Sequence, residues 1–237
     1  MNKIIYYSNT NESYNIASYI SSKTNYELIN IFNITSFEFD NIFLIFPIHY
    51  QNIPKEIKPL IKKIIAKKAI IITTYGKISY GNVLYETKKI LNAKVVGAIN
   101  IPSKHTYIKD DTHFNDYKIL DDLINKINDG KEIEIKKTKK NIFSSFFPIL
   151  RHQLSVKIIK NDNCNNCNLC NNVCKYIENG KIISNKCNRC LKCVINCPNK
   201  ALNFKLSPIM KKYLKIKDND SWFHCLFSSL LTSYFVL

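Results

Sequence analysis

Eight of the nine cysteines in this 237-residue chain form two sets, and each cysteine of the second set follows its counterpart by 23 residues. Within each set, two residues separate the first three cysteines and three residues precede the fourth. The sets are Cys164, Cys167, Cys170 and Cys174, then Cys187, Cys190, Cys193 and Cys197. A repeat at a fixed interval indicates two copies of one structural unit. Thiols spaced this closely are typical of metal ligands.

This spacing is typical of bacterial ferredoxins, in which three close cysteines bind one [4Fe-4S] cluster and the fourth cysteine binds the other cluster. The repeat therefore predicts two clusters with crossed fourth ligands. One cluster is expected on Cys164, Cys167, Cys170 and Cys197, and the other on Cys187, Cys190, Cys193 and Cys174. Pro198 follows the last ligand as in that pattern, whereas Lys175 stands at the matching place in the first set.

Structural zinc and disulfides are the alternatives to iron–sulfur clusters. Zinc sites use four ligands, usually as two pairs separated by a longer loop, and triplets with a distant fourth cysteine do not follow that plan. Disulfides form in oxidising compartments, and no stretch near the first residue has the pattern of a signal peptide. A cytoplasmic location is therefore expected. Cys225 lies outside the repeat, and we interpret it as a buried, inert thiol.

The first 130 residues alternate short apolar runs with amphipathic stretches. The apolar runs, expected as buried strands, are residues 3–7, 26–32, 41–46, 68–74 and 94–101. Helices are expected at residues 13–22, from Pro54 onward, at 80–91 and at 116–128. Continuous apolar strands between amphipathic helices indicate a parallel sheet covered on both faces. The predicted fold is α/β, a doubly wound five-stranded sheet followed by a small α+β domain with the clusters.

Changes in composition divide the chain into four parts. These are a sheet domain at 1–131, a basic and aromatic linker at 132–160, a cluster domain at 161–206 and an apolar tail at 207–237. The last 17 residues carry no Lys, Arg, Asp or Glu. Because such a segment is at the lower limit of a spanning helix, docking onto the protein is favoured and membrane association is the alternative.

The chain is strongly basic, with 35 Lys and Arg against 18 Asp and Glu and a formal charge of +17. Arginine, which reads base edges and binds phosphates in two-point contacts, occurs only at Arg151 and Arg189. Nucleic acid is therefore not expected as a partner. A basic surface instead attracts acidic redox proteins.

A polar turn, Ser8 to Ser13, joins the first expected strand to the first helix. Hydroxyl side chains and free backbone N–H groups at a helix N-terminus can hold a phosphate. The other reading is an ordinary helix cap, since Ser and Thr are also favoured there. The residues alone favour the helix cap.

The turn resembles the phosphate loop of flavodoxin-like proteins, and in particular of an anaerobe family that fuses a flavodoxin-like domain to a two-cluster ferredoxin. The resemblance spans residues 1 to 206 and implies an FMN site, with Asn9 and Asn11 standing where the family has glycine. Two further loops, 47–54 and 73–76, match segments that flank the flavin ring. The implied flavin residues are Ser8, Asn9, Thr10, Asn11, Ser13, Pro47, His49, Tyr50, Tyr75 and Gly76.

The resemblance implies an electron carrier, an oxidoreductase component rather than a stand-alone enzyme, which passes electrons between one-electron partners and a flavin. Two alternatives remain open. In one, the protein is a two-cluster ferredoxin whose sheet domain binds no flavin and serves for partner docking. In the other, it is a flavin-dependent reductase of a small substrate.

Overall fold

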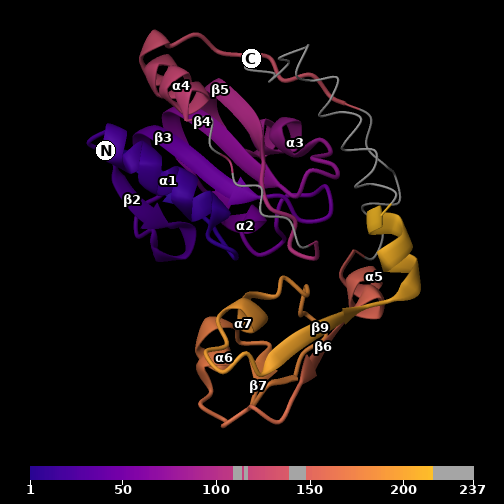
Figure 1. Cartoon of the computed structure of the whole chain (residues 1–237). Coiled ribbons are helices and arrows are strands. Elements are labelled where there is room, and N and C mark those ends of the chain that lie inside the picture. The colour runs from indigo at the N-terminus through magenta and orange to yellow at the C-terminus, as the bar shows by residue number, and fades with distance from the viewer. Residues whose placement is uncertain (109–113, 115–116, 139–147, 216–237) are drawn as a thin grey trace. The chain divides into compact units, whose positions relative to one another are not determined.

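The computed structural model describes residues 1–108, 114, 117–138 and 148–215 (Figure 1). These residues divide into two compact units, one within residues 1–138 and the other within residues 148–215. The charge-free end of the predicted tail and Cys225 lie outside the described residues. Within the described part of the chain, no helix combines the length and the apolar character needed to cross a membrane.

The first unit is built on a five-stranded sheet in which every pair of neighbouring strands is parallel. The strands are β1 (Asn2–Tyr6), β2 (Glu27–Asn30), β3 (Glu38–Pro47), β4 (Ile65–Tyr75) and β5 (Asn92–Pro102). Their order in the sheet is β2-β1-β3-β4-β5, which is the order of flavodoxin-like doubly wound folds. The α/β prediction for this part of the chain is confirmed.

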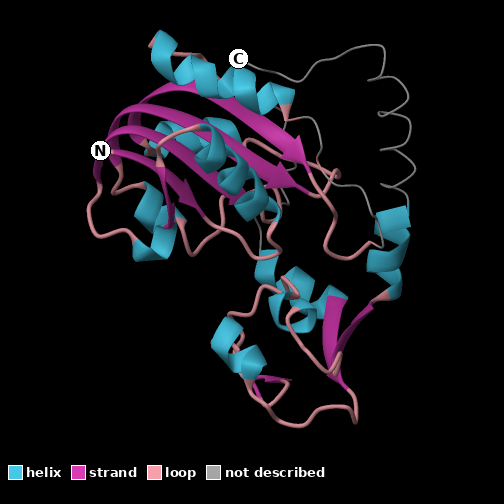
Figure 2. Cartoon of the chain, turned by 60° about the vertical axis from the view of Figure 1, so that its left-hand side comes forward, coloured by secondary structure: helices cyan, strands magenta, loops and turns pink. Residues whose placement is uncertain are grey.

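Helices cover both faces of the sheet, as Figures 1 and 2 show. They are α1 (Glu12–Lys23), α2 (Lys58–Ile61), α3 (Val83–Ile90) and α4 (Lys118–Asp129), and a 3₁₀ turn, η1, spans Ile31–Asn33. Ile4 and Ile5 show the principle, because they alternate between a core shared with α1 and α4 and a core on the other face. Burial on both faces is the reason that the strands read as continuous apolar runs.

The second expected helix is shorter than its sequence suggested. Pro54 does not open a helix, because its carbonyl oxygen accepts the N–H groups of Ile57 and Lys58 in a turn. The helix α2 then begins at Lys58, with Pro59 in its first turn, where a missing N–H costs nothing.

The start of the predicted linker packs on the first unit. Ile133 donates its N–H to the carbonyl oxygen of Val95 at 2.9 Å, and its side chain contacts the core of the sheet. Five residues later, the N–H of Thr138 donates to the side-chain oxygen of Asn82 at 2.6 Å. Residues 132–138 therefore extend the sheet unit beyond the predicted boundary at residue 131.

The second unit is a small α+β arrangement in which a helix over residues 208–215 follows the last strand. Its other elements are α5 (Pro148–Ser155), β6 (Val156–Lys160), α6 (Leu169–Val173), β7 (Ile177–Glu178), β8 (Lys181–Ile182), α7 (Lys192–Ile195) and β9 (Leu202–Leu206). The first strand, β6, pairs antiparallel with the last strand, β9, while β7 pairs with β8. Residues 156–160, predicted as linker, thus form part of this unit.

Candidate functional site

The 23-residue interval of the cysteines is also an interval of backbone conformation. Asn166 and Asn168 have positive φ angles of 57° and 59°, and the residues 23 positions later, Arg189 and Leu191, have 58° and 61°. The helices α6 and α7 begin directly after Asn168 and Leu191. The two cysteine loops are therefore two copies of one local fold.

The hydrogen bonds of the two loops repeat at the same interval. The side-chain oxygen of Asn165 accepts the N–H of Cys167 at 3.3 Å, and that of Asn188 accepts the N–H of Cys190 at 3.2 Å. Such turns let an asparagine side chain replace a backbone acceptor and hold a tight loop. They orient the middle cysteine of each triplet.

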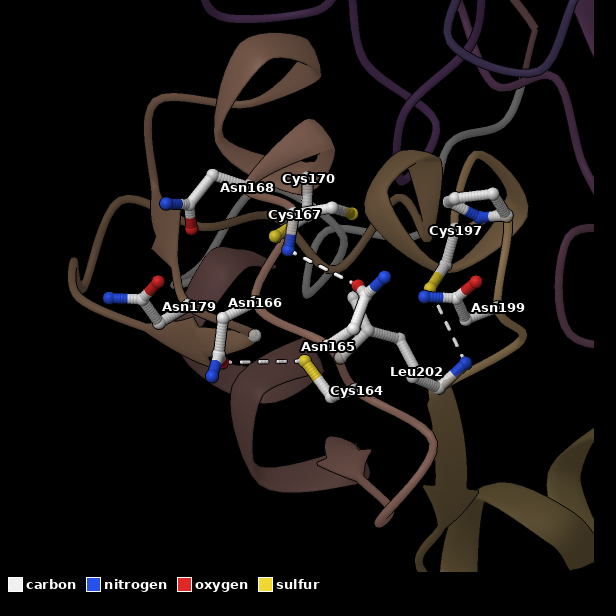
Figure 3. A pocket seen from close by; sticks show the side chains of 13 residues that line it. Cys164, Asn165, Asn166, Cys167, Asn168, Cys170, Asn179, Cys197, Asn199 and Leu202 are labelled. Atoms are coloured by element: carbon white, nitrogen blue, oxygen red, sulfur yellow. Dashed lines mark hydrogen bonds between the residues drawn. The ribbon is translucent and has the colours of Figure 1, made fainter.

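One pocket brings together the first triplet and the fourth cysteine of the second set. It contains about 330 Å³ of empty space, part of it open to solvent. Its lining includes Cys164, Cys167, Cys170 and Cys197, and Figure 3 shows Cys197 across the pocket from the three cysteines of the first loop. The crossed set expected for one cluster thus lines a common space.

The other crossed set also lies within interacting distance. Burial raises the pKa of the Cys193 thiol to about 12, and the neighbouring Cys190, Cys174 and Cys187 act in the same direction. The pKa of Cys174 is likewise raised, first by burial. A buried thiol beside three others needs a nearby cation to become a thiolate, and the iron that the cysteine spacing predicts would supply that charge.

The described thiols do not form a ready-made site for a single metal ion. Within the described ranges, no group of three or more His, Cys, Asp or Glu side chains is gathered closely enough to hold one metal ion directly. A zinc ion needs four ligands at about 2.0–2.3 Å, whereas a four-iron cluster spreads its thiolates over separate irons. Four cysteine sulfurs are the donor set that a [4Fe-4S] cluster uses, and the clusters themselves stay a prediction.

Backbone and amide groups surround the sulfur atoms. The N–H of Ala201 donates to the sulfur of Cys197 at 3.3 Å, whereas the Cys164 thiol is itself the donor in its 3.7 Å contact with the side-chain oxygen of Asn166. Hydrogen bonds to ligand sulfur are one of the means by which a protein sets the potential of an iron–sulfur cluster. The sequence spacing did not reveal these groups.

In the first unit, the predicted flavin residues meet at the carboxyl edge of the sheet. The amide nitrogen of Asn9, after β1, donates to Nε2 of His49, after β3, at 3.3 Å. The hydroxyl of Ser13 lies 2.8 Å from that of Thr74, near the end of β4. Ligands bind at this edge in open α/β sheets, so the residues lie where the resemblance implied.

One hydroxyl group of the predicted phosphate loop is engaged within the protein. Ser13 and Thr74 are both buried and hydrogen-bond to each other, so the Ser13 hydroxyl faces the sheet. Asn11 adopts the left-handed φ of 67° just before α1, and Glu12 adds an acidic side chain to the first turn. A carboxylate there competes with a phosphate for the helix N-terminus. Ser8 and Thr10 are half-buried in the same turn.

A partly buried acid–base group lies at this edge. Glu56 accepts the hydroxyl of Tyr7 at 2.5 Å and lies 4.0 Å from Nδ1 of His49. Burial lowers the pKa of His49, and Glu56 opposes that shift. Because Asn9 donates to Nε2, a neutral His49 carries its proton on Nδ1, toward Glu56. Tyr7 and Glu56 are not among the residues that the resemblance implied.

The two loops that were predicted to flank a flavin ring, 47–54 and 73–76, make contacts within the protein. Tyr50 and Gln51 both have positive φ angles, 56° and 64°, in a turn that links His49 to Asn52. A Cβ at Gly76 would lie 2.5 Å from the ring of His105, so His105 packs closely against Gly76. Tyr75 packs instead against Tyr80, and Pro47 ends β3.

Two of the implied flavin residues are thus engaged within the protein, and FMN binding stays a prediction. The Ser13 hydroxyl is engaged with Thr74, and His105 packs against Gly76.

Comparison with models of known protein families finds no match for this chain, and comparison with curated proteins finds none either.

Proposed function

We propose that this chain is an electron-transfer protein that carries two [4Fe-4S] clusters within residues 161–206. The observation that carries the proposal is the pocket lined by Cys164, Cys167 and Cys170 together with Cys197. Two loops with one backbone geometry, repeated at 23 residues, support a second, equivalent set.

When bound, each cluster supplies a centre that gains or loses one electron. The chain supplies the thiolates and an apolar surround, in which Cys193 belongs to a small core with Ile177 and Leu202. The Ala201 N–H donates to the Cys197 sulfur and so favours negative charge there. These residues bind, shield and hydrogen-bond the ligand sulfur atoms.

The role of the sheet unit separates two candidates. FMN stays a prediction, and a flavin would let the protein couple one-electron and two-electron carriers. The second candidate is a sheet unit that binds no flavin and serves for docking. It is favoured by the Ser13–Thr74 hydrogen bond and by the close packing of His105 against Gly76. A reductase of a small substrate requires the flavin and depends on the same test.

Partners and location belong to the proposal as well. We propose acidic redox proteins as partners, since the chain carries a formal charge of +17, and neither nucleic acid nor a membrane. A cytoplasmic location is consistent with eight cysteines that must stay reduced to bind iron.

The iron and FMN content of the anaerobically reconstituted full-length protein tests this proposal, after gel filtration removes excess flavin. We expect about eight irons per chain and no FMN that elutes with the protein. FMN at one per chain would reverse the choice between the two candidates. Iron absent from a folded protein would overturn the electron-transfer proposal itself.

A further inference from the structure

Lys160, at the end of β6, is held against the first cysteine loop. Its ammonium donates to the side-chain oxygen of Asn166 and to the carbonyl oxygen of Asn179, each at 3.2 Å. Two acceptors on two different segments define the position of the charge. Lysine side chains on a surface usually lose such order to entropy, so this one is unusually constrained.

The stem of Lys160 is fixed as well as its head. Gly180 has a φ of 76°, and a Cβ at that position would lie 2.7 Å from Cδ of Lys160. Glycine therefore allows both the turn after Asn179 and the close approach of the lysine stem. The aliphatic part of the Lys160 side chain packs over the turn at Gly180, and its ammonium lies against the first cysteine loop.

The acceptor Asn166 links the ammonium to a predicted cluster ligand. Asn166 lines the pocket of the first crossed set, and its side-chain oxygen lies 3.7 Å from the sulfur of Cys164; Figure 3 shows this contact. The ammonium is thus separated from the sulfur by a single amide group. A cation at this range interacts measurably with added negative charge, even where solvent screens it.

The lysine–asparagine pair occurs in one loop only. At the 23-residue interval, Ile183 stands where the first half has Lys160, and Arg189 stands where it has Asn166. The two halves therefore share a backbone but differ in the charged groups beside their cysteines. This difference in nearby charged groups would give the two predicted clusters different reduction potentials.

We infer that the Lys160 ammonium, held by Asn166 and Asn179, raises the reduction potential of the cluster bound by Cys164, Cys167, Cys170 and Cys197. Reduction adds one electron, and a nearby positive charge stabilises the product more than the reactant. Lys160 acts through Asn166 and is a positioning residue, not a ligand. This inference rests on the proposed function, because it requires the clusters.

The test compares midpoint potentials from redox titrations of the reconstituted full-length protein followed by electron paramagnetic resonance. Lys160→Met keeps the linear stem over Gly180 and removes the charge. We expect one of the two midpoints to fall, by up to about tenfold in the one-electron equilibrium or about 59 mV. Lys160→Arg keeps the positive charge and should therefore keep the wild-type midpoint. Lys157→Met is the matched control, since Lys157 is exposed on the other face of the same strand and should move neither midpoint.

Several outcomes decide the inference. A shift in Lys160→Met that shrinks at high salt, as screening requires, supports it. Unchanged midpoints in Lys160→Met, or equal shifts in Lys157→Met, overturn it while the iron content still upholds the proposed function. Lys160→Gln provides a second neutral variant, and a midpoint that it leaves in place also overturns the inference. Wild-type protein without iron overturns both proposals.

Discussion

At the residue scale, asparagine side chains and left-handed backbones shape both cysteine loops. Asn166 and Asn168 occupy left-handed positions in the first loop, and asparagine tolerates this region better than most residues. Arg189 and Leu191 adopt the same angles in the second loop, at a cost of about 1–3 kcal/mol each. The second loop therefore keeps its geometry against local preference, as expected where a bound group requires it.

The crossed assignment of the ligands can be tested residue by residue. Cys197→Ser should damage the cluster of the first triplet, because Cys197 faces Cys164 across the pocket. Its resonance spectrum should then match that of Cys167→Ser, and the spectrum of Cys174→Ser should match that of Cys190→Ser. Cys225→Ser, outside the repeat, is the control and should keep about eight irons. A Cys197→Ser spectrum equal to that of Cys190→Ser would show uncrossed ligation.

At the scale of elements, the extended segment 132–138 completes the sheet unit. Lys88 in α3 donates to the carbonyl oxygen of Ile133 at 2.6 Å and lies 2.8 Å from Glu132. Asn82, just before α3, is buried and makes no capping bond to the helix. Its side chain is used instead to hold Thr138, so the segment and the helix stabilise one another.

Asn82→Ala should therefore destabilise the sheet unit. It removes the acceptor of the Thr138 N–H, a loss of about 0.5–1.5 kcal/mol, because Thr138 is exposed and water can replace the lost acceptor. Hydrogen exchange of the β4 and β5 amides across a urea series measures the effect in this unit. Asn92→Ala, at an exposed position of β5, is the control, with an expected change within about 0.5 kcal/mol. Equal midpoints for the two variants would contradict the proposed role of the segment.

At the scale of the whole molecule, the positive charge is concentrated in the second unit. Residues 148–215 hold thirteen Lys and Arg and two Asp and Glu, a difference of +11 within a total of +17. The unit with the cysteine loops therefore carries most of the positive charge that would attract an anionic partner. A basic surface around an electron-transfer centre raises the rate of encounter with anionic partners.

Electron transfer from the reduced protein to a small anionic metal complex should slow as salt is added. Screening reduces the attraction between the basic unit and an anion, since the Debye length falls from about 30 Å at 0.01 M to about 10 Å at 0.1 M. Stopped-flow mixing should show a several-fold loss of rate over this range. A neutral quinone is the control and should show no such loss. Equal salt slopes for the two acceptors would contradict electrostatic steering.

Local pattern was sufficient for much of this protein. The apolar runs predicted the five parallel strands, because strands buried on both faces must be apolar throughout. The cysteine interval predicted two equivalent loops, since a repeat in sequence imposes a repeat in backbone, as the φ angles of Asn166 and Arg189 show. The helix expected from Pro54 was wrong at its start, because a turn competed locally with the helix.

The amino-acid sequence by itself determined the strands of the sheet, the two cysteine loops and the excess of positive charge, all of which depend on neighbours along the chain. The tertiary structure alone decided which side chains from distant segments meet. It turned Ser13 toward Thr74 and joined Glu56 to His49, and it brought Lys160 to Asn166. Such contacts depend on packing and on the direction of single side chains, and no periodicity in the sequence records them.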